Sequence, residues 1–142
     1  MIGLVVTGHE SFATGVSSAL ALLAGELQDV GVVDFPGTQS AEELGVNLTA
    51  AVDAFEEADG VLVCADVLGG SPFKAAAILA AGRPGVRVVS GTNLPLLIEA
   101  YMAHGTAVDI DAFARQVVET ARMSTSLYEP APYVEETEED GI

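Results

Sequence analysis

The sequence predicts an α/β fold in which an open, mostly parallel sheet carries helices on both faces. Four short apolar runs recur along the 142 residues, and each is followed by a turn and a longer stretch of helical pattern. Alternating strands and helices of this kind are typical of parallel sheets with right-handed crossovers. The composition agrees, because half of the residues are hydrophobic, only 6% are aromatic and Trp is absent. A core of Ala, Val, Leu and Ile suits a parallel sheet buried beneath helices.

The four apolar runs predict the strands. The third run is nearly continuous in apolar residues, as expected for a central strand that is covered on both faces. It contains Cys64, which we expect to be a small core residue. Because Cys64 is the only cysteine, an intrachain disulfide and a cysteine-based metal cluster are excluded. The predicted strands are residues 2–7, 30–35, 60–66 and 86–90.

The segments that follow the strands predict the helices. Ser40 is placed to cap the second helix, with Glu42 and Glu43 in its first turn. Ser71 is expected to cap the third helix, because a proline follows it at the first helical position. The fourth helix ends near His104, which we interpret as a surface residue at the helix terminus. The predicted helices are residues 12–24, 41–58 and 72–81, one leading from the turn at 91–95 to residue 104, and an amphipathic stretch over 109–123.

The end of the chain departs from this pattern. Residues 124–129 are predicted to form a short edge strand. Residues 130–142 hold two prolines and five acids and are predicted to be a disordered tail. We therefore expect one domain over residues 1–129, followed by an acidic tail over residues 130–142.

The charge balance limits the partners. Twenty-one acidic residues against five basic ones give a formal net charge of −16. Nucleic acid is a poor partner, because its backbone is bound by clustered Lys and Arg, and an anionic membrane surface is disfavoured for the same reason. A basic protein is the natural complement, although an acidic surface that only aids solubility is an open alternative. The sequence has no signal-peptide pattern and no run of ~18 apolar residues, so a soluble cytoplasmic protein is expected.

Three loops at the carboxyl ends of the predicted strands carry unusual polar residues. They are Gly8-His9-Glu10, the segment from Asp66 to Ser71, and Gly91-Thr92-Asn93. In open parallel sheets, ligands bind at this edge, where the strand order reverses. If the strand order is 2-1-3-4, the first and third strands are neighbours, and His9 and Asp66 leave them side by side.

This combination suits phosphoryl transfer. A neutral imidazole such as that of His9 is a nucleophile near pH 7 and a good leaving group once phosphorylated. Asp66 could accept the second ring N–H and fix the tautomer. The helix that starts at Ser71 offers free N–H groups, a dipole and a hydroxyl, and Gly69 and Gly70 allow close approach. Each feature alone has a structural explanation as a packing residue, a loop cap or a plain turn, and their convergence favours a site.

Four motifs, in this order and spacing, resemble the IIA domain of mannose-family sugar phosphotransferase systems. The resemblance covers about residues 1–125. The first and third motifs together are specific, whereas neither would suffice alone. The motifs are Val5-Val6-Thr7-Gly8-His9 with Phe12-Ala13, Val33-Asp34-Phe35-Pro36, Asp66-Val67-Leu68-Gly69-Gly70-Ser71-Pro72-Phe73 and Gly91-Thr92-Asn93-Leu94-Pro95.

The resemblance implies a cytoplasmic phosphocarrier that takes a phosphoryl group from the small carrier HPr and passes it to a IIB protein for sugar uptake. His9 matches the phosphorylated histidine of that family, and Asp66 matches the aspartate that pairs with it. Ser71 falls where a hydroxyl lies near the phosphoryl group. We expect Gly69 and Gly70 to contribute to phosphate binding, and neither a cofactor nor a metal ion.

The resemblance also implies an assembly. Members of the family are homodimers that exchange a C-terminal antiparallel edge strand, which here would be residues 124–129. Contact with the membrane would be indirect, through IIC and IID subunits. The chain departs from the family in its acidic tail and in the absence of a following IIB domain, so we expect IIB to be a separate chain. Only Lys74 lies close to the predicted site among the basic residues, so helix-terminus donors must bind most of the phosphate.

Three alternatives share parts of this pattern. A donor domain for a dihydroxyacetone kinase has the same fold and histidine, but its third loop usually lacks the Gly-Gly-Ser-Pro-Phe run. A receiver-like signalling domain would use Asp66 as acceptor, but it needs an acidic pair after the first strand and a Lys after the last. An FMN-binding flavodoxin-like domain needs flanking aromatic residues, for which Phe73 and Tyr101 are poor candidates.

Overall fold

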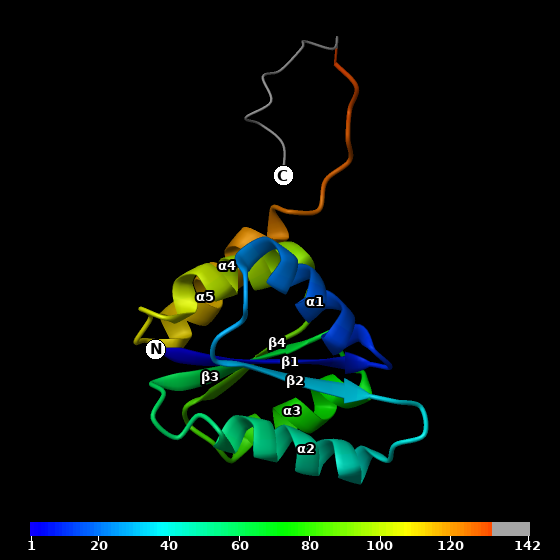
Figure 1. The fold of residues 1–142 in the computed structure, drawn as a ribbon, viewed down its shortest axis with the longest axis vertical. Helices are drawn as coiled ribbons and strands as arrows, with labels where there is room; N and C mark the ends of the chain where they lie inside the picture. Colours follow the sequence, from blue (N-terminus) through cyan, green and yellow to red (C-terminus); the bar gives the residue numbers. More distant parts are fainter. Residues whose placement is uncertain (132–142) are drawn as a thin grey trace.

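The computed structural model describes residues 1–131, in which four parallel strands form one sheet between two layers of helices (Figure 1). The neighbours in the sheet follow the order β2-β1-β3-β4, so the predicted fold class and strand order are confirmed. β1 and β3 lie in the middle and are buried along their lengths, apart from the last residue of β1. The strands are β1 (Ile2–His9), β2 (Val30–Phe35), β3 (Gly60–Ala65) and β4 (Val86–Val89).

Two apolar clusters hold the helices against the two faces of the sheet. α1, α4 and α5 pack over Leu4 and Val6 of β1, whereas α2 and α3 pack over Val5 (Figure 1). Because side chains alternate along a strand, His9 leaves β1 on the side of Val5, which is the side of α2 and α3. The helices are α1 (Phe12–Ala24), α2 (Ala41–Asp53), α3 (Ser71–Ala81), α4 (Leu94–His104) and α5 (Ile110–Arg122).

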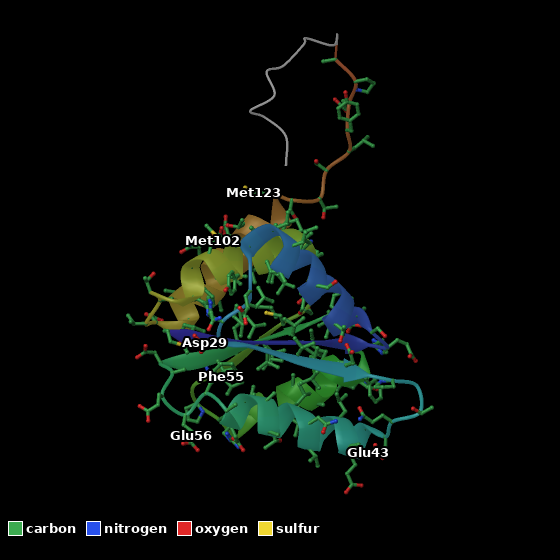
Figure 2. All side chains as sticks on the ribbon, in the orientation of Figure 1. Asp29, Glu43, Phe55, Glu56, Met102 and Met123 are labelled. Carbon is green, nitrogen blue, oxygen red and sulfur yellow. The ribbon has the colours of Figure 1, made fainter. Side chains whose placement is uncertain are left out.

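The second helix is shorter than the predicted 41–58. Ser40 caps it as expected, by accepting the Glu43 N–H, but the helix ends at Asp53 and turns follow. The ring of Phe55 lies against Gly3, where an added Cβ would be 2.5 Å from the ring. Figure 2 shows Phe55 between the sheet and α2, with Glu56 on the outside of the turn. The helix ends where the chain turns to pack this partly buried ring against β1.

The placement of His104 at the surface was wrong. The side chain is 5% exposed, its Nδ1 lies 2.8 Å from the Ile2 carbonyl oxygen, and its ring stacks on Tyr101. His104 is therefore a core residue that joins α4 to the start of β1. Cys64 is buried as predicted, and burial raises the pKa of its thiol to about 12.

The last described residues have no regular structure. Residues 124–131 are exposed and form no strand within the described chain. The strand exchange predicted for residues 124–129 requires a second copy of the chain and stays a prediction. The predicted tail falls almost entirely on residues 132–142, which lie outside the described residues. Among the helices of residues 1–131, none has the length and apolar character needed to cross a membrane.

Candidate functional site

The carboxyl ends of two adjacent strands bring His9 and Asp66 together. His9 is the last residue of β1, and Asp66 directly follows β3, its parallel neighbour. The Nδ1 atom of His9 lies 2.7 Å from Oδ2 of Asp66. The His9 side chain is 47% exposed and that of Asp66 is 13% exposed. The ring is thus open to a partner, while the carboxylate that holds it is mostly covered.

Asp66 is held as a carboxylate by three hydrogen bonds. Its Oδ2 accepts the backbone N–H of His9 (2.8 Å) as well as the ring, and its Oδ1 accepts the Val67 N–H (2.8 Å). Partial burial alone would raise the pKa of Asp66, but the bonds from His9 and Val67 outweigh burial and lower the pKa below its ordinary value. A carboxylate only accepts hydrogen bonds, so Nδ1 of the neutral His9 ring carries the hydrogen. The lone pair is then on Nε2.

The amino terminus of α3 approaches the His9 ring through Gly70. Gly70 is the N-cap, Ser71 is the first helical residue and Pro72 the second, so the prediction that Ser71 caps this helix was wrong by one residue. A Cβ on Gly70 would lie 2.7 Å from Cε1 of His9, so the ring occupies the space that a capping side chain needs. Gly69 makes the preceding turn with a φ of +82°, and its Cβ position is open space.

The first turn of α3 has donors to spare. The Gly70 N–H donates to the Val67 carbonyl (3.2 Å), and the Lys74 N–H donates to the Gly70 carbonyl (2.9 Å). The N–H groups of Ser71 and Phe73 have no acceptor within residues 1–131, as is usual for the first turn of a helix. An anion bound near the His9 ring would meet these donors and the positive end of the helix dipole.

The end of β2 closes the other side of the site. The Phe35 ring lies edge-on to the His9 ring, with 6.1 Å between the centroids. The Glu10 N–H donates to the Phe35 carbonyl (2.8 Å), and Glu10 Oε1 accepts the Gly37 N–H (2.7 Å). The Asp34 carboxylate accepts hydrogen bonds from the backbone N–H of Thr14 (3.0 Å) and from the Thr14 hydroxyl. The first of these satisfies a free N–H group in the first turn of α1. Glu10, Asp34 and Phe35 were not predicted from the sequence as site residues.

The third predicted loop supports the site from behind. The Gly91 N–H donates to the backbone carbonyl of Asp66 (2.9 Å), and the Thr92 N–H donates to that of Ala65 (3.1 Å). Asn93 caps α4 by accepting the Leu96 N–H (2.9 Å). This loop therefore fixes the backbone that carries Asp66. Within residues 1–131, no group of three His, Cys, Asp or Glu side chains is arranged to hold a metal ion.

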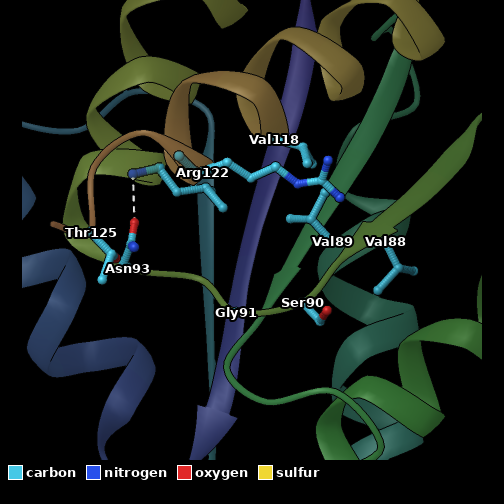
Figure 3. A pocket seen from close by; sticks show the side chains of 10 residues that line it. Val88, Val89, Ser90, Gly91, Asn93, Val118, Arg122 and Thr125 are labelled. Carbon is cyan, nitrogen blue, oxygen red and sulfur yellow. Dashed lines mark hydrogen bonds between the residues drawn. The ribbon is translucent and has the colours of Figure 1, made fainter.

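A hollow of about 480 Å³ lies elsewhere, beside β4, α4 and α5 (Figure 3). Arg122 extends across it toward Val89, and Thr125 stands at its margin near Asn93 (Figure 3). Gly91 and Asn93 of the third predicted loop line this hollow, whereas His9, Asp66 and residues 69–71 do not. It lies along β4, which is the last strand of the described sheet.

Comparison with known proteins identifies the family. The family described as "PTS system fructose IIA component" matches residues 3–118. The PTS system mannose-specific EIIAB component of Escherichia coli (strain K12) is 30% identical over 131 residues, which are 92% of this chain and 41% of that protein. The PTS system sorbose-specific EIIA component of Klebsiella pneumoniae is 32% identical over 99 residues, which are 70% of this chain and 72% of that protein.

A solved structure agrees. The crystal structure of phosphotransferase system component EIIA from Streptococcus agalactiae superposes with a TM-score of 0.82 at 27% identity, covering 89% of this chain and 96% of that one. The chain spans about two fifths of the length of the mannose-specific EIIAB relative. The family match includes all four strands, both members of the His9–Asp66 pair and most of α5. The chain therefore belongs to the mannose-type family of phosphotransferase system IIA components.

Proposed function

We propose that this chain is a phosphocarrier of a phosphoenolpyruvate-dependent sugar phosphotransferase system, and that His9 carries the phosphoryl group. The observation that carries the proposal is the 2.7 Å contact between His9 Nδ1 and Asp66, with the ring otherwise exposed. This contact leaves Nε2 as the free nucleophile. Family membership supports a phosphohistidine intermediate, and His9 is the exposed one of the two histidines.

The transfer step follows from this arrangement. The Nε2 lone pair of His9 attacks the phosphorus atom of a phosphorylated donor, and a bond from nitrogen to phosphorus forms. The bond from phosphorus to the donor atom breaks, and its electron pair returns to the donor. The His9 ring keeps its Nδ1 hydrogen and becomes cationic, and the Asp66 carboxylate stabilises that charge. The second transfer repeats the step with His9 as the donor.

The phosphoryl oxygens need donors in both steps. In this proposal the Ser71 and Phe73 N–H groups, the Ser71 hydroxyl and the dipole of α3 supply them. The start of α3 at Ser71 and the close approach of Gly70 to the His9 ring support this role. Lys74 is the basic side chain of this helix, and it follows directly on the first turn. We assign Gly69 to the turn that precedes the helix, so its contribution to phosphate binding is indirect.

The partners form part of the proposal. The donor is HPr and the acceptor is a IIB protein, and the exchange takes place in the cytoplasm, with membrane contact only through IIC and IID subunits. The name of the mannose-specific relative joins IIA and IIB, which supports IIB as the acceptor. The formal charge of −16 favours partners with basic docking surfaces.

The alternatives are not favoured. Both oxygens of Asp66 are occupied by His9 and Val67, so this carboxylate is a poor phosphoryl acceptor for a receiver-like domain. The hydroxyl of Tyr101 accepts the Gln28 N–H and its ring stacks on His104, so it does not serve an FMN ring. The relatives of known specificity are named for mannose, sorbose and fructose systems, which favours sugar uptake over a kinase donor.

The test is phosphate transfer from labelled phosphoenolpyruvate with enzyme I and HPr. We expect one phosphoryl group per chain, lost in acid and stable in base, located on the peptide that contains His9. The His9→Ala variant should take up no label. The second histidine, His104, serves as an internal control because it is buried. Label retained in His9→Ala, or found on His104, would overturn the proposal.

We also propose a homodimer in which residues 124–129 pair with β4 of a second copy. Met123, Leu127 and Tyr128 are 74%, 85% and 80% exposed, which is unfavourable for apolar side chains in an isolated chain. In this proposal the exchanged strand lies along the hollow beside β4, which Thr125 borders (Figure 3). Sedimentation should give a dimer for the full chain and a monomer for a chain that ends at Met123. A dimer that survives this truncation would contradict the exchange.

A further inference from the structure

The residue next to His9 has an unusual backbone conformation. Glu10 has a φ of +49°, in the left-handed region that side-chain-bearing residues rarely adopt. It lies directly between β1 and α1, one residue after the proposed nucleophile. Such conformations persist only where the surrounding contacts over-determine them, and they concentrate at functional sites. The contacts of Glu10 therefore indicate what its conformation achieves.

Glu10 holds the turn that follows β2 from two directions. Its N–H donates to the Phe35 carbonyl (2.8 Å), and its Oε1 accepts the Gly37 N–H (2.7 Å). A Cβ on Gly37 would lie 2.8 Å from that same oxygen, so a glycine allows the carboxylate to reach the backbone. Glu10 makes both bonds in its left-handed conformation. Glu10 thus fixes residues 35–37 against the end of β1.

The fixed turn bears on the His9 ring through Phe35. Phe35 is the partner of His9 in the β1–β2 register, and their rings meet edge-on at 6.1 Å. Asp66 and Gly70 approach the same ring from the β3 side of β1, while Phe35 approaches from the β2 side. The imidazole is therefore held on both sides, and Glu10 supports the contact on the β2 side by fixing the turn that carries Phe35.

We propose that Glu10 is a positioning residue for phosphoryl transfer. By holding residues 35–37 it keeps the Phe35 ring against His9, so the imidazole cannot rotate away from Asp66 and Nε2 stays directed out of the site. This inference rests on the proposed role of His9 and adds a residue that acts through Phe35. Glu10 acts by its hydrogen bond to Gly37, not by its charge.

The test compares two variants of Glu10 that differ in whether the side chain can accept a hydrogen bond from the Gly37 N–H. Glu10→Gln retains an oxygen for the Gly37 N–H, whereas Glu10→Ala has none. We expect Glu10→Ala to slow transfer from phospho-HPr about tenfold, within the ~100-fold loss that a 1 Å misplacement can cause. Glu10→Gln should stay within about threefold of wild type. Glu56→Ala, which removes an exposed acid from a surface turn, is the matched control and should transfer like wild type.

Two further measurements separate positioning from a general structural role. Phe35→Leu combined with Glu10→Ala should transfer no more slowly than the slower single variant, because both act on the same contact. Nitrogen NMR of the resting protein should place the hydrogen on Nδ1 of His9 in wild type and Glu10→Gln, and divide it between the two nitrogens in Glu10→Ala. Circular dichroism checks that each variant is folded.

Several results would overturn the inference. Wild-type transfer and an unchanged tautomer in Glu10→Ala would show that Glu10 does not position the ring. Equal losses in Glu10→Gln and Glu10→Ala would assign the effect to charge. The tautomer measurement needs no phosphoryl donor. A wild-type protein that accepts no phosphate would therefore overturn the proposed function, while a tautomer shift in Glu10→Ala would still support the positioning role.

Discussion

Replacing Gly70 by alanine tests how closely α3 must approach His9. Gly70 has an extended backbone, with φ −71° and ψ 166°, so alanine fits this conformation without strain. The new Cβ would lie 2.7 Å from His9 Cε1 and 3.1 Å from Val67 Cγ1. Carbon atoms in contact prefer separations of about 3.5–4.0 Å, so the imidazole must withdraw by roughly 1 Å. The perturbation therefore falls on the ring.

The expected cost follows from this displacement. The bond from His9 Nδ1 to Asp66 is 2.7 Å long, and a movement of about 1 Å away from Asp66 would take it beyond hydrogen-bonding distance. Misplacement of this size can cost up to ~100-fold in rate. We expect transfer from phospho-HPr to slow by about 10- to 100-fold, which corresponds to about 1.4–2.7 kcal/mol in the barrier. The melting temperature should change little, because a half-exposed ring can move without unfolding the sheet.

Gly69→Ala is the matched control. Gly69 has a φ of +82°, and its Cβ would meet nothing within 4 Å. Alanine there should cost about 1–2 kcal/mol of unfolding free energy through backbone strain, with a smaller effect on transfer than Gly70→Ala. Single-turnover transfer and thermal denaturation followed by circular dichroism measure the two effects. Wild-type transfer by Gly70→Ala, or an equal loss of transfer in both variants, would refute the reasoning.

Three other predictions concern the carboxylates around the site. Asp66→Asn should slow transfer from phospho-HPr roughly 10- to 1,000-fold, or about 1.4–4 kcal/mol, with an unchanged circular dichroism spectrum; a wild-type rate would reduce Asp66 to a loop cap. Because the pKa of Asp66 is lower in the folded chain than its unfolded value of about 3.9, its contribution to the unfolding free energy is fully present above that pH and is lost as the pH falls through the folded pKa. The stability gap between wild type and Asp66→Asn in urea should therefore be larger at about pH 7 than at about pH 3, and an equal gap would contradict the assignment. Asp34→Ala removes the acceptor for Thr14 and should lower the unfolding free energy by about 1 kcal/mol, whereas Ser11→Ala, at a residue that makes no capping bond, should have a smaller effect; the reverse order in urea denaturation would disprove the role of Asp34.

Much of the fold could be predicted because local patterns determine it. The apolar runs of β1 and β3 are buried on both faces, so they stand out in the sequence without reference to the rest of the chain. Ser40 and Asp109 cap their helices with their own side chains, which is a local interaction that sequence alone can indicate. The site at His9 and Asp66 followed from strand order, because the carboxyl ends of neighbouring parallel strands meet at one edge.

The features that were missed depend on contacts between distant segments. The helix pattern of α2 continues through Phe55, and only the burial of that ring against Gly3 shows why the helix ends earlier. Gly70 and not Ser71 is the N-cap of α3, and its contact with the His9 ring joins two segments that are distant in the sequence. His104 is buried because α4 packs over the start of β1, which its place at a helix end does not reveal.

The contacts through which Glu10 and Phe35 hold the His9 ring were missed for a related reason. Phe35 faces His9 only in the β1–β2 register that the structure has, and a shift of one residue would turn it to the other side of the sheet. Glu10 was placed in the loop after the first strand, but its role was not predicted because no sequence pattern marks a left-handed glutamate. The positions of Phe35 and His9 could have indicated the contact, because each is the last residue of its strand and the two strands are neighbours.

In the proposed function His9 is the phosphorylated residue, and its Nε2 carries the phosphoryl group because Nδ1 is bonded to Asp66. The most direct test is NMR of the nitrogen-15-labelled protein after phosphorylation by phosphoenolpyruvate, enzyme I and HPr. We predict coupling of one phosphorus nucleus to Nε2 of His9, with the hydrogen retained on Nδ1. Coupling to Nδ1, or phosphorus bound to any other residue, would contradict the account.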